Sequence, residues 1–299
     1  MKTNSSNVTA HSFTPWFFLA PYLILALVFF LYPLLYAGWL SFHQTDGPHE
    51  AIFVGLENYK FIFTDPAFYK ALKNTTIFAL ASICIQLPLS LGLAILLNNS
   101  NSKLKNLFRL LIFSPNLVGQ IFVGVIFQVI FISHYGIFNR GVQMLFNAGL
   151  ETQWLSTPSL IMPALIIVSL WMYVGFNMIY FLAALQTVDK QLLEAAQIDG
   201  ANNWQVFLHV TLPQIKPVAI FVVIMSTIGS YQLFELPFSL LKSGFGVNDS
   251  GLTIVGYLYD NAFNMGDLGT GAAIGWVLAL IIFTISLIQL KVTTSPQDR

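Results

Sequence analysis

A polar connection between two apolar stretches, residues 186–217, holds the side chains whose types and spacing best suit a chemical role. Within it, Glu194 is followed directly by Ala195 and Ala196. A carboxylate in this position can pair with a cation on another protein, and small side chains let a second surface approach closely. The pattern therefore predicts a docking surface in which Glu194 contacts a basic residue of a partner.

The same connection is expected to fold as two short helices that project at right angles to membrane-spanning helices. Asp189 suits the N-cap of a helix over Lys190–Ile198, and Gly200 can adopt the left-handed backbone that stops it. We expect a second short helix to end at Pro213. Its evidence is a set of residues at helical spacing: Trp204, Phe207, Leu208 and Thr211.

Glu235 is the one carboxylate inside a segment that is otherwise apolar enough to cross a membrane. Such a group costs about 2.5–3.5 kcal/mol at the centre of a spanning helix, so it is a functional candidate. It lies near the outer edge of its segment, where its side chain could line a solute pathway or reach the lipid headgroups, and both readings stay open. On a helix, Glu235 would share one face with Tyr231, Phe234 and Phe238, with Gln232 beside it.

A second polar wall is predicted one apolar segment earlier, where Tyr173 and Asn177 are one helical turn apart and Tyr180 follows. Aromatic planes and hydrogen-bonding groups together suit a sugar, whose faces are apolar and whose edges are hydroxyls. Polar residues between helices, Gln128 included, are at least as often packing contacts. Our hypothesis is that a translocation cavity is lined by Tyr173, Asn177, Tyr231, Gln232 and Glu235.

Other chemistries find little support. The five histidines are scattered, the single cysteine Cys84 lies in an apolar stretch, and no Gly-Lys dipeptide of a phosphate-binding P-loop occurs. We expect no catalytic residues and no metal site. The formal net charge of zero removes the basic footprint of a nucleic-acid binder.

Composition places these residues in a membrane. Of the 299 residues 56% are hydrophobic and only 9% are charged, whereas soluble domains carry about 25% charged residues. A spanning helix needs about 20 apolar residues, so the gaps between charges predict an all-α integral membrane protein with six transmembrane helices. They are expected over Trp16–Leu40, Asn74–Leu97, Leu110–Ile132, Leu160–Leu185, Val218–Phe238 and Thr270–Leu290.

Lysine and arginine in the short loops indicate the orientation. With the N-terminus inside, eight basic residues are cytoplasmic and five are external, which favours a cytoplasmic location for both termini. The expected organisation is a cytoplasmic segment 1–15, a transmembrane domain 16–290 that includes the loop 186–217, and a cytoplasmic tail 291–299. The external connections 42–73, 133–159 and 239–269 are long enough that they could form short helices.

The central motif resembles the EAA loop of permease subunits of bacterial ABC importers. It consists of Glu194, Ala195, Ala196, Asp199, Gly200, Leu212 and Pro213. Further segments resemble the sugar-type permeases of this family, similar to the larger maltose permease subunit and to the lactose and glycerol-phosphate permeases: Phe17–Tyr22, Tyr32–Pro33, Gly55–Tyr59 and Ala183–Gln186.

The resemblance implies a type I importer permease fold in the bacterial cytoplasmic (inner) membrane, with a loop that docks as a coupling helix on an ATPase. It also implies the partners: a second, non-identical permease subunit, two ATPase subunits that bind ATP and Mg²⁺, an extracytoplasmic solute-binding protein, and membrane lipid. No cofactor is expected in this chain. The solute could be a carbohydrate, a polyol or a glycerol-phosphate ester.

An ion-coupled secondary transporter is the alternative reading. Such proteins show internal repeats, interrupted helices and buried acids, whereas this sequence shows no convincing repeat and one peripheral carboxylate. A membrane enzyme ranks third, because no nucleophile with a base is visible.

Overall fold

The computed structural model describes residues 14–45, 51–98, 103–146, 151–242 and 244–293. The chain divides into two compact units, Met1–Thr64 with Asp260–Trp276, and Asp65–Tyr259 with Val277–Arg299. In the first unit the described elements are α1 (Thr14–Ala26), a π-turn (Leu27–Leu31), α2 (Tyr32–Leu40), β1 (His43–Thr45), β2 (Ala51–Phe53), α3 (Glu57–Thr64), a π-turn (Asp260–Asn264) and the start of α15 (Leu268–Thr293).

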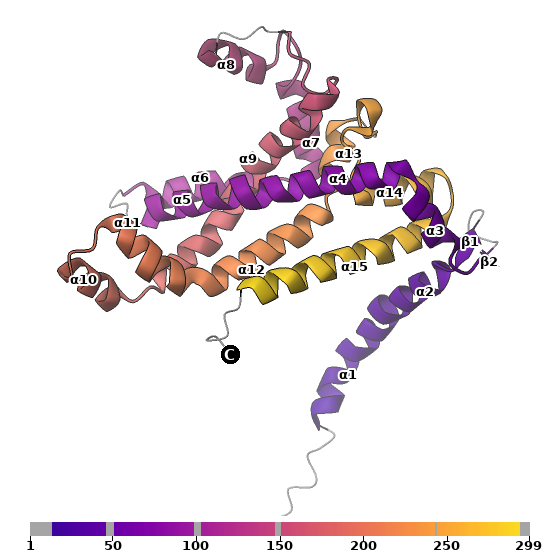
Figure 1. Ribbon diagram of the computed structural model, residues 1–299, viewed down its shortest axis with the longest axis horizontal. Coiled ribbons are helices and arrows are strands. Elements are labelled where there is room, and N and C mark those ends of the chain that lie inside the picture. Colours follow the sequence, from indigo (N-terminus) through magenta and orange to yellow (C-terminus); the bar gives the residue numbers. More distant parts are fainter. Residues whose placement is uncertain (1–13, 46–50, 99–102, 147–150, 243, 294–299) are drawn as a thin grey trace, which may run out of the picture. The chain divides into compact units, whose positions relative to one another are not determined.

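The second unit holds the remaining elements, shown in Figure 1. They are α4 (Pro66–Ala81), a π-turn (Ser82–Gln86), α5 (Leu87–Asn98), α6 (Lys105–Phe113), a 3₁₀ turn (Ser114–Leu117), α7 (Gln120–Ile130), α8 (Ile137–Phe146), α9 (Pro158–Gln186), α10 (Lys190–Ile198), α11 (Asn203–Val206), a π-turn (Phe207–Thr211), α12 (Leu212–Tyr231), α13 (Glu235–Leu240), a 3₁₀ turn (Val247–Asp249), α14 (Ile254–Tyr259) and the end of α15.

In the first unit, polar side chains hold the short hairpin and its neighbours. β1 pairs antiparallel with β2, and His43 lies opposite Phe53. The amide of Asn58 donates to the carbonyl oxygens of Ser41 and His43, each at 2.9 Å. The Asp267 carboxylate accepts from the backbone N–H groups of Thr45 and Thr270.

Four of the six predicted spans are confirmed, the first with the expected bounds and the other three with shifted ends. Helical segments cover Trp16–Leu40, Pro66–Asn98, Pro158–Gln186 and Leu268–Thr293. The second starts eight residues earlier than expected, because Asp65 caps it by accepting from the Ala67 N–H at 2.9 Å and Pro66 suits the first turn.

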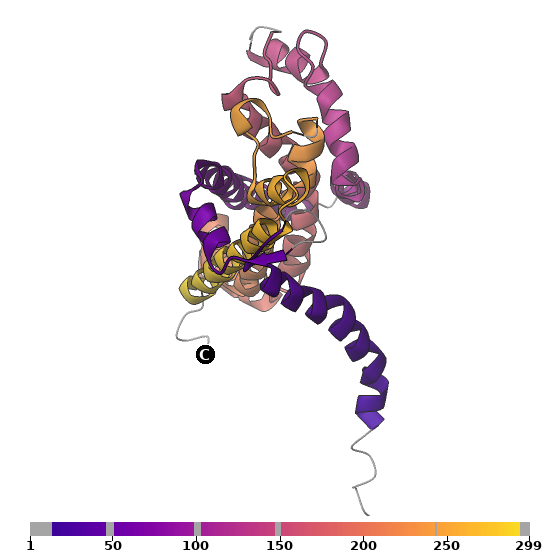
Figure 2. The same cartoon turned by 90° about the vertical axis from the view of Figure 1, so that its right-hand side faces the viewer.

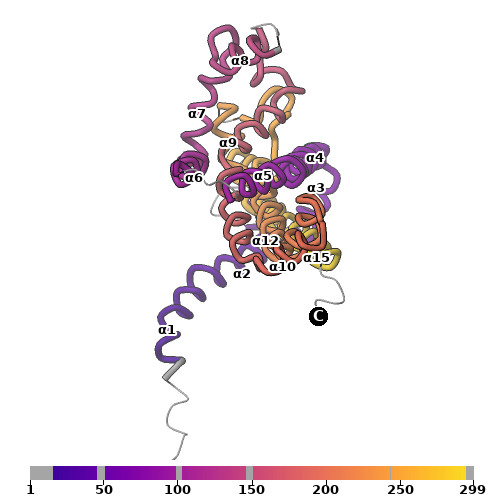
Figure 3. Tube along the Cα trace, turned by 90° about the vertical axis from the view of Figure 1, so that its left-hand side faces the viewer, coloured from indigo at the N-terminus to yellow at the C-terminus, as the bar shows by residue number. Residues whose placement is uncertain are grey.

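The third span is not the single helix expected over Leu110–Ile132. Two pieces, Lys105–Leu117 and Gln120–Ile130, meet at an angle of 99°, and Figures 2 and 3 both show α6 turning sharply into α7. Val118 and Gly119 adopt extended backbone angles at the bend. The proline of the preceding 3₁₀ turn, Pro115, suits such an interruption.

The fifth span differs most from the prediction over Val218–Phe238. One helical segment runs from Asn203 to Tyr231, and the chain then breaks before α13 starts at Glu235. The expectation that Pro213 ends a separate short helix is therefore wrong. The carbonyl oxygen of Leu233 in the break is not left unpaired, because the Thr253 hydroxyl donates to it at 2.7 Å.

Three π-turns explain why three of the prolines in these spans do not stop a helix. Each is followed, two residues after its end, by a proline: Pro33, Pro88 or Pro213. Proline lacks an N–H and its ring clashes with the carbonyl four residues back. In every case that carbonyl lies in the middle of the π-turn, whose wider five-residue hydrogen bond lets the helix continue.

Two apolar cores lie among the described residues of the second unit. One, between α5, α9 and α12, includes Leu87, Met178 and Ile215. The other, between α7, α9 and α13, includes Phe127, Leu165 and Leu236. Glycines allow the closest approaches: a Cβ at Gly124 would meet Ser239, and one at Gly175 would meet the backbone of Ile112.

We expect Gly175→Ala to destabilise the protein, because the added methyl group would collide with the Ile112 carbonyl oxygen, a backbone atom with little freedom to move. Overpacking of this kind costs about 1–3 kcal/mol. The readout is the thermal unfolding midpoint in detergent. Gly92→Ala is the matched control, because nothing lies within 4 Å of its Cβ position. Equal midpoints for the two variants would contradict this packing.

Candidate functional site

A cavity of about 530 Å³ lies among the helices of the second unit. Its walls come from α9, α12, the α4 to α5 span, the break before α13, the first residue of α7 and the start of α14. Aromatic rings, uncharged polar side chains and a few aliphatic side chains line it, together with Glu235. The rings are Phe78, Tyr173, Phe176, Tyr180, Phe221 and Phe234, and the other polar residues are Ser82, Gln86, Gln120, Asn177, Ser226, Ser230 and Gln232.

Four of the five predicted pathway residues meet at this cavity. Tyr173 and Asn177 reach it from α9, and Gln232 and Glu235 reach it from the break and the first residue of α13. Gln232 and Glu235 are exposed there. The Tyr173 side chain interacts with that of Gln120 and is within electrostatic range of Glu235.

Tyr231 does not line the cavity. Its side chain is buried, and its hydroxyl lies 3.1 Å from the Thr76 hydroxyl. The expectation that Tyr231, Phe234, Glu235 and Phe238 share one helical face is wrong, because α12 ends at Tyr231. Phe234 still lines the cavity, and its ring packs on that of Phe238.

The second span contributes polar residues that were not predicted from the sequence. The Ser82 hydroxyl lies 2.8 Å from that of Ser226, and the Ser169 hydroxyl donates to Gln86 Oε1 at 3.5 Å. Ser82 and Gln86 bound the π-turn before Pro88, and a serine and a glutamine one turn apart in an apolar run would have been a usable signal. Gln128 serves packing, since its amide donates to the Ser239 carbonyl oxygen.

The elbow, defined as Asp189–Asn202 with α10 and its turn, has the local structure predicted for it. Asp189 accepts from the Gln191 N–H at 2.8 Å, and the helix covers Lys190–Ile198 as expected. Gly200 has φ +82°, and nothing lies within 4 Å of its Cβ position. Asn202 then starts the next helix through a reciprocal pair of hydrogen bonds with Gln205.

The elbow presents acidic and apolar groups to its surroundings. Glu194, Ala195 and Asp199 are exposed, and Ala196 is half-buried. Two large apolar side chains at and next to the elbow are solvent-exposed: Ile198 is 86% exposed and Trp204 is 65% exposed. A surface of this composition is typical of an interaction site.

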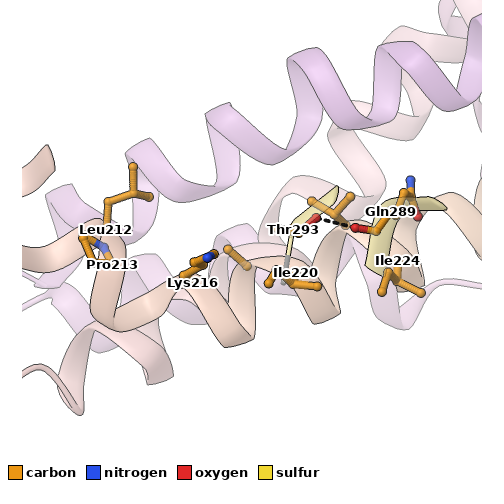
Figure 4. A pocket seen from close by; sticks show the side chains of 9 residues that line it. Leu212, Pro213, Lys216, Ile220, Ile224, Gln289 and Thr293 are labelled. Carbon is orange, nitrogen blue, oxygen red and sulfur yellow. Dashed lines mark hydrogen bonds between the residues drawn. The ribbon is translucent and has the colours of Figure 1, made fainter. Parts of the chain in front are cut away.

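Leu212 and Pro213 lie apart from α10, at the start of α12. Together with Lys216 they line a separate groove of about 290 Å³ between α12 and the end of α15. Figure 4 shows this groove, with Gln289 and Thr293 contributed by α15. The groove is apolar along most of its length, including Ile220 and Ile224.

α9 connects the two candidate regions, because it contributes cavity residues and ends just before the elbow. α8 precedes it and α10 follows it, so these elements lie towards opposite ends of a helix of 29 residues (Figure 1). Such a helix is about 43 Å long, more than the bilayer core of about 30 Å. The cavity residues of α9 lie in its C-terminal half, and the elbow lies beyond its C-terminal end.

Comparisons with known proteins agree with this architecture. Residues 86–292 match the family described as binding-protein-dependent transport system inner membrane component. The arabinooligosaccharides transport system permease protein AraP of Bacillus subtilis (strain 168) is 40% identical over 94% of this chain and 88% of its own length. The lactose transport system permease protein LacF of Rhizobium radiobacter is 35% identical over 92% of each chain.

A solved structure gives the same fold. A chain of a bacterial ABC transporter involved in the import of the acidic polysaccharide alginate superposes with a TM-score of 0.79 at 22% identity, over 94% of this chain and 95% of that one. The protein therefore belongs to the family of inner-membrane components of binding-protein-dependent transport systems. The all-α type I permease fold is confirmed, and the chain is a multi-pass inner-membrane protein.

We expect the cavity to be open to water at Gln232 and closed at its neighbour Tyr231. In a Cys84→Ser background, a cysteine introduced by Gln232→Cys should react with a small charged thiol reagent faster than one introduced by Tyr231→Cys, because only exposed thiols ionise and react readily. Labelling rates in detergent, measured by mass spectrometry, give the readout. Equal rates would contradict the break after Tyr231.

Proposed function

We propose that this chain is the transmembrane subunit of an ATP-driven importer that moves a sugar or a related solute through the cavity. The cavity carries the proposal, because its aromatic planes and uncharged hydrogen-bonding groups match the apolar faces and hydroxyl edges of a saccharide. The names of relatives support it, since AraP is a permease for arabinooligosaccharides, LacF for lactose, and MsmF of Streptococcus mutans for multiple sugars.

ATP hydrolysis is assigned to partner subunits in this proposal. ATP and Mg²⁺ would bind to two ATPase subunits, and this chain has no P-loop sequence. A second, homologous permease subunit would complete the pathway, and a solute-binding protein outside the membrane would deliver the solute. A related alginate importer has been solved in complex with its periplasmic protein carrying an alginate pentasaccharide. Both termini would be cytoplasmic.

The elbow is proposed as the contact with the ATPase. Glu194 would pair with a basic residue there, Ala195 and Ala196 would allow close approach, and Asp199 and Gly200 would hold the bend. The route to the cavity is direct, because the helical segment Asn203–Tyr231 starts at the elbow and ends at the cavity wall. The Asp189 N–H also donates to Gln214 Oε1 at 3.0 Å, which links the start of α10 to α12. Leu212 and Pro213, the last two residues of the coupling motif, would belong to the same contact region at the start of α12.

Copurification tests the proposal against an ion-coupled secondary transporter. An ATPase retained by the complex and released when the elbow is altered supports the importer. Solute uptake by the isolated chain under an ion gradient, without any ATPase, would overturn it.

We expect Gly200→Val to abolish coupled uptake, because a β-branched residue is strained at φ +82° and the bend between α10 and α11 would change. Gly200→Asn is the control, since asparagine tolerates left-handed angles. The measurements are solute uptake and ATPase activity of the same reconstituted complex. Wild-type uptake in Gly200→Val would count against a rigid elbow.

We expect Asn177→Ala to lower uptake about tenfold, which corresponds to the loss of one hydrogen bond of about 1.5 kcal/mol to the solute. Tyr173→Ala, Gln232→Ala and Glu235→Ala should each lower it as well, because all four side chains line the cavity. Initial rates of labelled solute uptake give the readout. Tyr231→Ala is informative beside them, and its defect should appear in stability because Tyr231 is buried. Wild-type rates in all four cavity variants would exclude this cavity as the pathway.

A further inference from the structure

The described lining of the cavity carries charge of only one sign, which is negative. Among the described residues that line it, Glu235 is acidic and none is Lys, Arg or His. α7 and α9 carry no charged residue along their whole lengths, and Lys216 of α12 lies in the other groove. On α4 the lysines precede Phe78, the first cavity residue of that span.

Glu235 is placed so that its charge acts on a solute. Its side chain is exposed at the cavity, directly after the break that ends α12. Its backbone carbonyl, and not its carboxylate, accepts the intrahelical bond from the Ser239 hydroxyl at 2.8 Å. Near it, the lining offers the neutral hydrogen-bonding groups of Tyr173, Gln120 and Gln232.

A carboxylate in this position would interact differently with uncharged saccharides and with saccharides that carry a carboxylate or a phosphate. The hydroxyl groups of an uncharged sugar can donate to it, and such charge-assisted bonds are stronger than neutral ones. A solute carboxylate or phosphate would instead meet a like charge, with no cation among the described lining residues of this chain to offset it. At about 6 Å and an effective dielectric constant of about 40, the repulsion corresponds to about a tenfold loss of affinity.

We propose that Glu235 makes this cavity selective for uncharged saccharides or polyols and excludes solutes that carry a carboxylate or a phosphate. The inference rests on the proposed function and narrows its solute class. Glu235 acts here as a specificity-determining residue that touches the solute.

The test measures binding to the assembled transporter without its solute-binding protein, so that only the cavity discriminates. The probes are α-1,4-galactobiose and arabinotriose, both neutral, and α-1,4-digalacturonate, which shares the galactobiose skeleton and carries carboxylates at C6. Competition in saturation-transfer NMR gives the ratio of the apparent Kd of digalacturonate to that of the tighter neutral probe. The variants are Glu235→Gln, Glu235→Asp and Gln232→Glu, with Glu151→Gln as a control because Glu151 is exposed and outside the cavity lining.

In the wild type we expect a ratio of at least about ten, as the repulsion estimate requires. Glu235→Gln should bring the ratio close to one, Glu235→Asp should keep it high, Gln232→Glu should raise it, and Glu151→Gln should leave it unchanged. The response to Glu235→Asp separates loss of charge from a folding defect.

Two results would overturn the inference alone: digalacturonate binding as tightly as the neutral probe in the wild type, or an unchanged ratio in Glu235→Gln. In both cases neutral saccharides still bind and the proposed function stands. Failure of both neutral probes to bind to an intact complex would instead overturn the proposed function, and the inference with it.

Discussion

The whole fold depends on one constraint: a backbone that crosses an apolar medium must satisfy its own hydrogen bonds. Proline works against this, because it removes a donor and displaces a carbonyl. At three of its prolines the chain forms a π-turn that ends two residues before the proline, as at Phe207–Thr211 before Pro213. The helical segments therefore stay continuous through residues that usually end a helix.

Where the spans do break, the breaks adjoin the cavity. The bend at Val118–Gly119 precedes Gln120, and the break after Tyr231 includes Gln232 and Phe234. Irregular backbone is tolerated at membrane depth where protein buries it or where it lines a water-filled space. The Thr253 hydroxyl pairs with one freed carbonyl, while polar side chains from the breaks face the cavity. The interruptions in the helices thus place polar side chains at the cavity. The cavity in turn makes irregular backbone tolerable at membrane depth.

The sequence was sufficient wherever a local signal decided the structure. Gaps between charges located four of the six spans, and the Asp189 cap with Gly200 located α10 to the residue. The sequence-based prediction failed where tertiary contacts determine the structure. The break after Tyr231 has no Gly or Pro at its start, so the apolar segment was predicted as one continuous helix, and Tyr231 was assigned to the wrong face. The error at Pro213 was the opposite one: a helix end was predicted, but the helix continues, because the π-turn before Pro213 accommodates the proline.

These two errors together change the mechanical picture of coupling. If Pro213 ended a helix, a flexible joint would separate the elbow from the membrane. Instead, one helical segment joins Asn203 to Tyr231, and the Asp189–Gln214 hydrogen bond ties the start of α10 to the same segment. Displacement of the elbow would then move Ser226, Ser230 and the end of α12 as a unit, and the break after Tyr231 is the first place where that motion can be absorbed. Gln232 and Glu235 lie in that break and at its far edge, so in the proposed mechanism the side chains expected to contact the solute are also the ones that this motion would reach.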